Sequence, residues 1–96
     1  MADVGTKLVY ENERVKVWEF TLASGDVFPE HTHELDYFFY VIEGSTFEVT
    51  RKSRVDTVSL DEGKVYFRVK GDTHSARNLG PTRYHEVLVE LKDPAR

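Results

Sequence analysis

The sequence predicts an all-β fold, either a sandwich or a barrel of short strands. Runs rich in Val, Phe, Tyr and Thr recur about every ten residues, which is the spacing of strands in such folds. Turn-forming residues such as Gly, Asp and Ser separate the runs, and no stretch carries the apolar period of a long helix. Together these observations favour an all-β architecture over a helical one.

The first two expected strands lie close together near the N-terminus. Leu8–Tyr10 is separated by three polar residues from a longer strand at Arg14–Leu22. The longer strand carries apolar side chains on both faces: Trp18, Phe20 and Leu22 on one, Val15 and Val17 on the other. We therefore expect the rest of the fold to cover one face and a second subunit the other, which predicts a symmetric homodimer.

The remaining strands are each bounded by turn sequences. A turn at 23–26 leads into the third strand, Gly44-Ser45 closes the most apolar one, and a basic hairpin tip follows residue 52. Further turns are expected at 61–63, 71–73 and 79–82. The expected strands are, in order, Val27–His33, Tyr37–Glu43, Thr46–Lys52, Val55–Leu60, Lys64–Lys70, His74–Asn78 and Arg83–Lys92.

Length and charge predict one domain without a nucleic-acid partner. The 96 residues form a single unit, expected over 1–96 with a core at about 8–92 and frayed ends. A domain of this size buries only roughly two thirds of its unfolded surface, which is a second reason to expect a homodimer. The 13 basic and 17 acidic residues give a net charge of −4 without any basic run. Nucleic acid and anionic membranes are therefore poor partners.

Composition also limits the chemistry and the cellular location. The absence of cysteine excludes disulfides, thiolate metal ligands and a cysteine nucleophile. The N-terminus has no basic stretch followed by an apolar one, and no run of roughly eighteen apolar residues occurs. We expect a soluble, cytoplasmic protein that binds a small-molecule ligand or substrate.

Three histidines form the most informative pattern. His31 and His33 are separated by one residue, so on an extended chain their imidazoles point to the same face. His74 follows another turn, and an antiparallel fold could bring all three rings together. Any single histidine has roughly even odds of being an ordinary surface or core side chain, but neutral imidazole is also the commonest protein ligand of metals. The pattern predicts a divalent metal site at His31, His33 and His74.

At these residues the sequence resembles the cupin family, whose members are small jelly-roll barrels with a metal in the barrel mouth. Gly25, His31, His33 and Gly44 match the spacing of the first family motif. Gly63, Gly71, His74 and Asn78 match that of the second, with Val69 where the family has proline. The resemblance implies a single-domain cupin jelly-roll barrel of two antiparallel sheets. Residues 11–19 and the run after His33 are also similar to small bacterial cupins labelled as β-alanine degradation proteins.

One position departs from the family pattern. The family places a ligand glutamate where this chain has Tyr37. The expected site is therefore three neutral imidazoles with water, completed by the Tyr37 phenol or, from the loop, by Glu34 or Asp36. Strand alternation favours Tyr37, because it points to the same face as Phe39 and Asp36 to the other. Tyr37 is the candidate catalytic residue, as a hydrogen-bond donor or an acid and base.

Three neutral ligands leave a divalent ion with its full charge, so the site should attract an anionic or enolate-forming ligand. Iron, zinc, nickel, manganese or copper would each suit three imidazoles. Cupins without the glutamate include oxygen-using enzymes that cleave diketones or oxidise thiols. The resemblance therefore implies a metal-dependent oxygenase or Lewis-acid lyase acting on a small organic acid or carbonyl compound. The alternatives are a non-catalytic module that binds a metal or a small ligand, and a cupin of the sugar isomerase or epimerase type.

Alternation also gives an expected pocket wall. Residues that share a face with the histidines or with Tyr37 are its candidates, although most aromatic residues are expected to be plain core. His85 is expected to face the same way as Val87 and Val89, as a pocket or core residue and not as a fourth ligand. The candidate pocket residues are Phe39, Tyr66, Ala76, Asn78 and His85.

Overall fold

The computed structural model describes residues 3–92 and consists of strands joined by turns. The strands are β1 Lys7–Glu11, β2 Val15–Leu22, β3 Val27–Thr32, β4 Asp36–Glu43, β5 Ser45–Arg51, β6 Arg54–Leu60, β7 Val65–Arg68, β8 Thr73–Asn78 and β9 Tyr84–Leu91. Each lies close to an expected segment. Strand β7 ends earlier than expected, because beyond it the amide of Lys70 donates to the side-chain carboxylate of Asp36, the first residue of β4, at 2.8 Å. The expected fraying at 93–96 lies outside the described residues.

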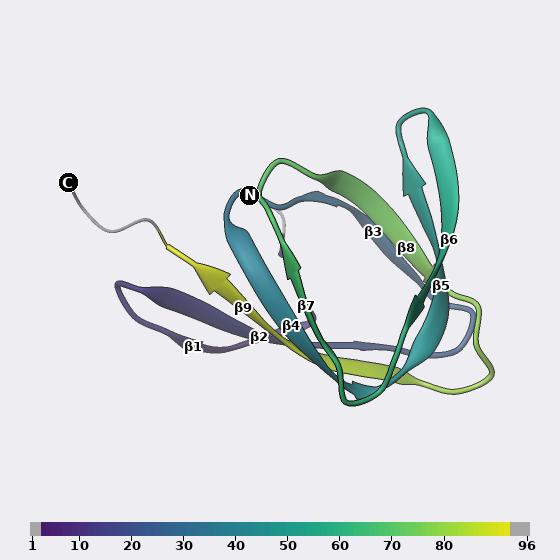
Figure 1. Cartoon of the computed structure of the whole chain (residues 1–96), viewed down its shortest axis with the longest axis horizontal. Coiled ribbons are helices and arrows are strands. Elements are labelled where there is room, and N and C mark those ends of the chain that lie inside the picture. Colours follow the sequence, from purple (N-terminus) through teal and green to yellow (C-terminus); the bar gives the residue numbers. More distant parts are fainter. Residues whose placement is uncertain (1–2, 93–96) are drawn as a thin grey trace.

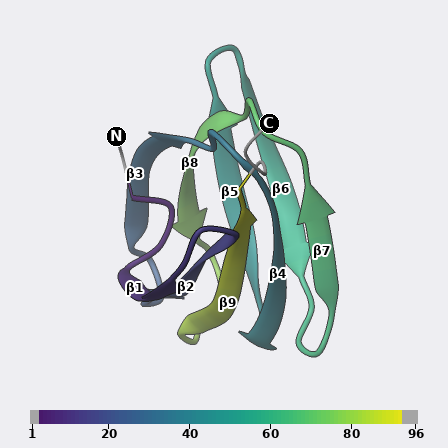
Figure 2. The same cartoon turned by 90° about the vertical axis from the view of Figure 1, so that its left-hand side faces the viewer.

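Two antiparallel sheets make up the molecule, as predicted. One has the strand order β1-β2-β9-β4-β7 and the other the order β3-β8-β5-β6. The sheets face each other across an interior, and the β5–β6 hairpin projects beyond them (Figure 1). The chain passes over one end of the sheets between β3 and β4 (Figure 2). Within residues 3–92 no strand pairing joins one sheet to the other, so the expected barrel is not closed by hydrogen bonds.

The core lies between the sheets. Trp18, Phe20 and Leu22 of β2 are buried there, as expected for one face of that strand, while Val15 and Val17 on the outer face are only half-buried. Strand β4 adds alternate residues, which are also buried. Edge-to-face packing joins Phe47 and Phe20 to the fully buried Tyr84. The described residues contain no helix that could span a membrane.

Strand β9 faces the opposite way from the prediction. Its buried residues are Tyr84, Glu86, Leu88 and Glu90. His85 and the valines therefore lie on the outer face of the sheet, where His85 is 3.5 Å from Glu19. The reversal is possible because each carboxyl group accepts one bond from a buried donor: the Tyr84 hydroxyl donates to Glu86 at 2.5 Å and the Trp18 indole to Glu90 at 2.7 Å.

Candidate metal centre

Strand pairing brings two of the three histidines together directly. His31 on β3 lies opposite His74 on β8 in the antiparallel register, after a bulge between Phe28 and His31. Residues opposite each other across two strands have neighbouring side chains. His33 follows His31 by two residues and so turns to the same face. The result is a cluster in which one ring nitrogen from each histidine lies within 4.8 Å of the others.

The backbone fixes His33 although it lies just past the end of β3. Its amide donates to the Asp72 carbonyl at 2.9 Å, and its carbonyl accepts from the Gly71 amide at 2.8 Å. Gly71 has a φ of 107°, a conformation that residues with a Cβ rarely adopt. The turn before β8 thus positions His33 as well as His74, which explains why the two sequence motifs build one site.

Hydrogen bonds orient two of the rings. His31 donates from Nδ1 to the Pro29 carbonyl at 2.9 Å, and His74 donates from Nδ1 to the Asp72 carboxylate at 2.8 Å. With the proton on Nδ1, the Nε2 atom of each neutral ring has a free lone pair that points into the cluster. Metal-binding histidines are commonly held in this way by a carbonyl or a carboxylate.

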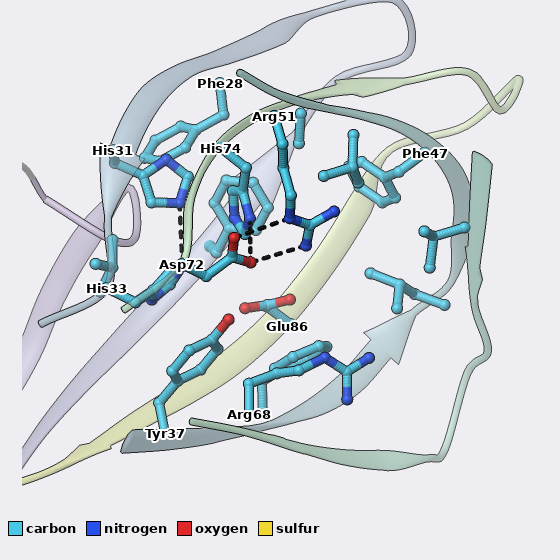
Figure 3. A pocket seen from close by; sticks show the side chains of 17 residues that line it. Phe28, His31, His33, Tyr37, Phe47, Arg51, Arg68, Asp72, His74 and Glu86 are labelled. Carbon is cyan, nitrogen blue, oxygen red and sulfur yellow. Dashed lines mark hydrogen bonds and ion pairs between the residues drawn. The ribbon is translucent and has the colours of Figure 1, made fainter. Parts of the chain in front are cut away.

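Asp72 is itself held by Arg51 from the neighbouring strand β5. The guanidinium donates from Nε and from Nη2 to the two carboxylate oxygens, each at 2.8 Å. This two-pronged contact keeps the pKa of Asp72 well below its usual range, so the carboxylate is charged at neutral pH. The sequence analysis missed both residues because it treated them as parts of a turn and of a hairpin. The dashed contacts of Figure 3 run from Arg51 through Asp72 to His74.

Burial keeps the three imidazoles neutral. It lowers the pKa of His33 to about 3, with a further effect from its two histidine neighbours. Burial is also the main cause of the lowered pKa of His31 and of His74. Neutral imidazole is the form that binds a metal, so no proton has to be displaced from these rings at neutral pH.

The donor set fits a divalent transition metal. Two nitrogens bonded to one zinc ion in tetrahedral geometry lie about 3.3 Å apart, and the Nε2 atoms of His31 and His33 are 3.1 Å apart. His33 Nδ1 is buried without a hydrogen-bond partner, so no hydrogen bond at Nδ1 orients this ring as it does in His31 and His74. Glu34 and Asp36 do not belong to the cluster. The exposed Glu34 lies by a smaller cavity, and Asp36 is bonded to the Lys70 amide.

Tyr37 lies against the cluster through its ring. The phenol stacks on the His33 imidazole with centroids 4.0 Å apart and planes inclined by 13°. Its hydroxyl points into the cavity, between Asp72 and Glu86 (Figure 3). Burial raises the pKa of Tyr37 above its ordinary value, and the Asp72 carboxylate adds to the effect. The phenol is therefore a neutral hydrogen-bond donor at the cavity wall.

The histidines open onto a cavity of about 120 Å³ between the sheets. Of the five expected pocket residues, Phe39 and Ala76 line it, whereas Tyr66, Asn78 and His85 do not. Tyr66 packs behind Phe39 and accepts a bond from the Asp61 amide at 3.0 Å. The fully buried Asn78 donates to the carbonyls of Leu22 and Thr82, so its role is to join strands. The outward turn of β9 removes His85 from the interior.

Glu86 is a cavity residue that the sequence analysis missed. It is only 5 % exposed and lines the cavity from the central strand β9. Burial raises its pKa to about 8, against which the bond from Tyr84 acts only weakly. The sequence signal was the pair Glu86 and Glu90 on one face of an otherwise apolar strand, which normally indicates a solvent-facing side.

Several solved structures resemble this chain. A cupin domain protein of Bordetella pertussis Tohama I aligns over 96% of this chain and 100% of its own, with 25% identity and a TM-score of 0.83. The polyketide cyclase RemF of Streptomyces resistomycificus aligns over 85% and 57%, with 21% identity and a TM-score of 0.62. KdgF of a Halomonas species aligns over 91% and 77%, with 23% identity and a TM-score of 0.61. The last two likenesses show the fold alone.

Sequence comparison gives the family. No curated protein matches the chain. The model of the cupin domain matches residues 18–89, well over half of the 96 residues, and this range contains the three histidines, Tyr37 and Glu86. The matched range, the paired sheets and the histidine cluster agree with one another, and the chain belongs to the cupin domain family.

Proposed function

We propose that this chain is a small metal-dependent enzyme that holds one divalent ion with His31, His33 and His74 and acts on a small organic acid or carbonyl compound. The observation that carries the proposal is the convergence of three neutral imidazoles at the wall of a cavity. Catalytic metal sites keep one position open to substrate, whereas structural sites are closed by protein ligands. When bound, the ion would supply Lewis-acid polarisation or, as iron, oxygen activation.

The cavity limits the size and charge of the substrate. A site of about 120 Å³ is comparable to an apolar cavity that holds one benzene molecule. Its walls are mainly aromatic and aliphatic, which is a poor match for a sugar. Arg68 lines it level with Tyr37, and no described residue pairs its guanidinium with a carboxylate. A small carboxylate or enolate meets this charge. The resemblance to cupins labelled as β-alanine degradation proteins implies a substrate of the same class.

The chain's own residues would then bind and orient the substrate. Tyr37 offers a neutral hydroxyl to an oxygen of the bound molecule. Asp72 and Arg51 hold the His74 ring and supply a fixed negative charge beside it. Aromatic side chains from both sheets exclude water from the interior, which strengthens these polar contacts.

We also propose that the protein acts as a homodimer. An apolar row crosses the outer face of the five-stranded sheet, one residue from each strand: Tyr10, Val17, Val89, Phe38 and Phe67. Tyr10 and Phe67 are each 55% exposed at its two ends. An exposed apolar stripe of this kind typically marks a protein interface. A second copy with the same row would cover it around a two-fold axis.

Metal analysis tests the proposed site. Protein purified without added metal should contain one divalent ion per chain, and His33→Ala or His74→Ala should lose it. His85→Ala is the matched control, because His85 lies on the outer face of β9 and outside the cluster. Wild-type metal content in both site variants would refute the site. Oxygen uptake with small diketones and thiols then tests catalysis, and a loaded protein inert toward every small acid and carbonyl compound would favour the binding-module alternative.

A further inference from the structure

A buried carboxyl group forms part of the cavity away from the histidines. One oxygen of Glu86 accepts the Tyr84 hydroxyl at 2.5 Å. The other oxygen has no hydrogen-bond partner among the described residues, and the group points into the cavity (Figure 3). Among the described residues only His33 Nδ1 and His85 Nε2 are buried without a partner, so the free oxygen of Glu86 is accessible from the cavity and available to a ligand.

Strand register gives the position of Glu86 relative to the metal centre. Tyr37, which stacks on His33, lies opposite Glu90, whereas Glu86 lies opposite Val41. The two levels are four residues apart along β9, or roughly 13 Å of strand. The backbone of Glu86 therefore lies beyond the histidine level, and the Tyr37 hydroxyl points into the space between the Glu86 carboxyl group and Asp72 (Figure 3).

Most side chains around Glu86 are apolar, apart from the hydroxyls of Tyr84 and Tyr37. Its neighbours across the sheet are Phe20 and Val41, and Phe28 and Phe47 line the same cavity. Arg51 is occupied by Asp72 at the histidine end, and the Arg68 guanidinium lies over the rings of Phe39 and Tyr66, 6.0 and 5.5 Å from their centroids. The raised pKa of Glu86 agrees with this setting and makes the group a neutral donor at pH 7. No charged neighbour contributes to the pKa of Glu86, so a charged ligand oxygen beside it would lack a direct counter-charge.

This inference rests on the proposed metal site and specifies its substrate. We propose that Glu86 is a substrate-binding residue that hydrogen-bonds an uncharged oxygen at the far end of the bound molecule. The substrate class is then a small molecule with three parts. A metal-binding head lies at the histidines, an apolar middle lies among the phenylalanines, and a hydroxyl or carbonyl group lies at Glu86.

Three hydroxamates that share one metal-binding head test the proposal. The probes are 4-hydroxybutanohydroxamate, pentanohydroxamate and succinic monohydroxamate, which end in a hydroxyl, a methyl and a carboxylate. Their affinities for the zinc-loaded protein are measured by calorimetry, with metal-free protein as the blank. The hydroxyl-ended probe should bind about tenfold more tightly than the methyl-ended one, the usual effect of one buried hydrogen bond. The carboxylate-ended probe should bind most weakly.

Variants assign this preference to Glu86. Glu86→Gln keeps a neutral donor and should retain the preference. Glu86→Leu combined with Tyr84→Phe, so that no buried hydroxyl loses its partner, should abolish it. Glu90→Gln is the matched control, because Glu90 lies on the same face of β9, is equally buried and bonds Trp18 outside the cavity.

The outcomes separate the two proposals. Equal affinity of wild-type protein for the hydroxyl-ended and methyl-ended probes would overturn the role of Glu86 and leave the metal site standing. The same conclusion would follow if the Leu and Phe double variant kept the wild-type preference. Failure of all three probes to bind the zinc-treated protein would refute the metal site, and the substrate class would fall with it.

Discussion

Replacing Glu86 by Gln should change how the stability of the metal-free protein depends on pH. The pKa of Glu86 is raised from the ordinary value of 4.5 to about 8 in the folded protein. Between these two values the folded state holds a proton that the unfolded chain has released. Stability therefore falls as the pH rises through this window, and Glu86→Gln, which cannot ionise, does not share the loss.

The magnitude follows from the shift. Each unit of pKa difference corresponds to about 1.4 kcal/mol, so the full window is worth about 5 kcal/mol in favour of the variant at high pH. This is a large part of the ~5–15 kcal/mol that stabilises a typical domain. The groups that face Glu86 are Tyr84 on its own strand, Tyr37 on β4 and the apolar Phe20 on β2. All of them are present in both proteins, so their contributions cancel in the comparison.

Urea unfolding at a series of pH values between 4.5 and 8.5 measures the effect. Trp18 is the single tryptophan and is buried in the core, so its fluorescence reports unfolding. A chelator keeps bound metal from adding its own stabilisation. The unfolding free energies of variant and wild type should diverge steadily as the pH rises. A difference that stays constant within about 0.5 kcal/mol between pH 5 and 8 would show that Glu86 does not hold its proton in the folded protein.

Substitutions at three other residues have defined expected outcomes. Asp72→Asn should weaken zinc binding about 10- to 100-fold in a chelator competition, because the charged partner of His74 Nδ1 is lost; unchanged affinity would contradict the orienting role. Tyr37→Phe should leave zinc affinity within about twofold of wild type but weaken acetohydroxamate binding roughly three- to tenfold, because one hydrogen bond is lost. Tyr37→Glu should tighten zinc binding, because it adds a carboxylate ligand. Calorimetry measures both, and equal hydroxamate affinity would remove the donor role. Wild-type protein should sediment as a dimer at micromolar concentration and Val89→Lys as a monomer of 11.1 kDa; a wild-type monomer would refute the dimer.

The strands could be predicted from the sequence because their signals are local. Gly63 and Gly71 have φ values of 81° and 107°, so the turns that they form lie where the glycines stand. The alternation of β2 identified its buried face correctly. The histidine cluster could also be predicted from the sequence, because two histidines separated by one residue on a strand point to the same face. The second motif then supplied the third ring on a strand that pairs with the first.

The partners of the cluster could not be found in this way. Arg51 and Asp72 are 21 residues apart and meet only because the strand that ends in Arg51 lies beside β8. Spacing along the chain carries no sign of this contact. Both residues also have an ordinary role in the sequence, one beside a basic hairpin tip and the other in a Gly-Asp turn. The Asp72 carboxylate bonds the ring of His74, two residues further along the chain. The Arg51 guanidinium bonds Asp72 from a neighbouring strand.

Strand β9 shows why alternation failed at the place that matters most for the substrate. A strand with apolar residues on one face and two glutamates on the other normally turns the glutamates to solvent. Here the apolar face continues an outer row that includes Phe38 and Phe67, while the glutamates are buried between the sheets. The cost of burying Glu86 is offset in part by Tyr84, and one oxygen is left for a ligand. Local rules of folding fail most often at functional sites. The inverted strand therefore supports both proposals: its outer face carries part of the apolar row that a second subunit would cover, and its inner face presents the Glu86 carboxyl group to the cavity.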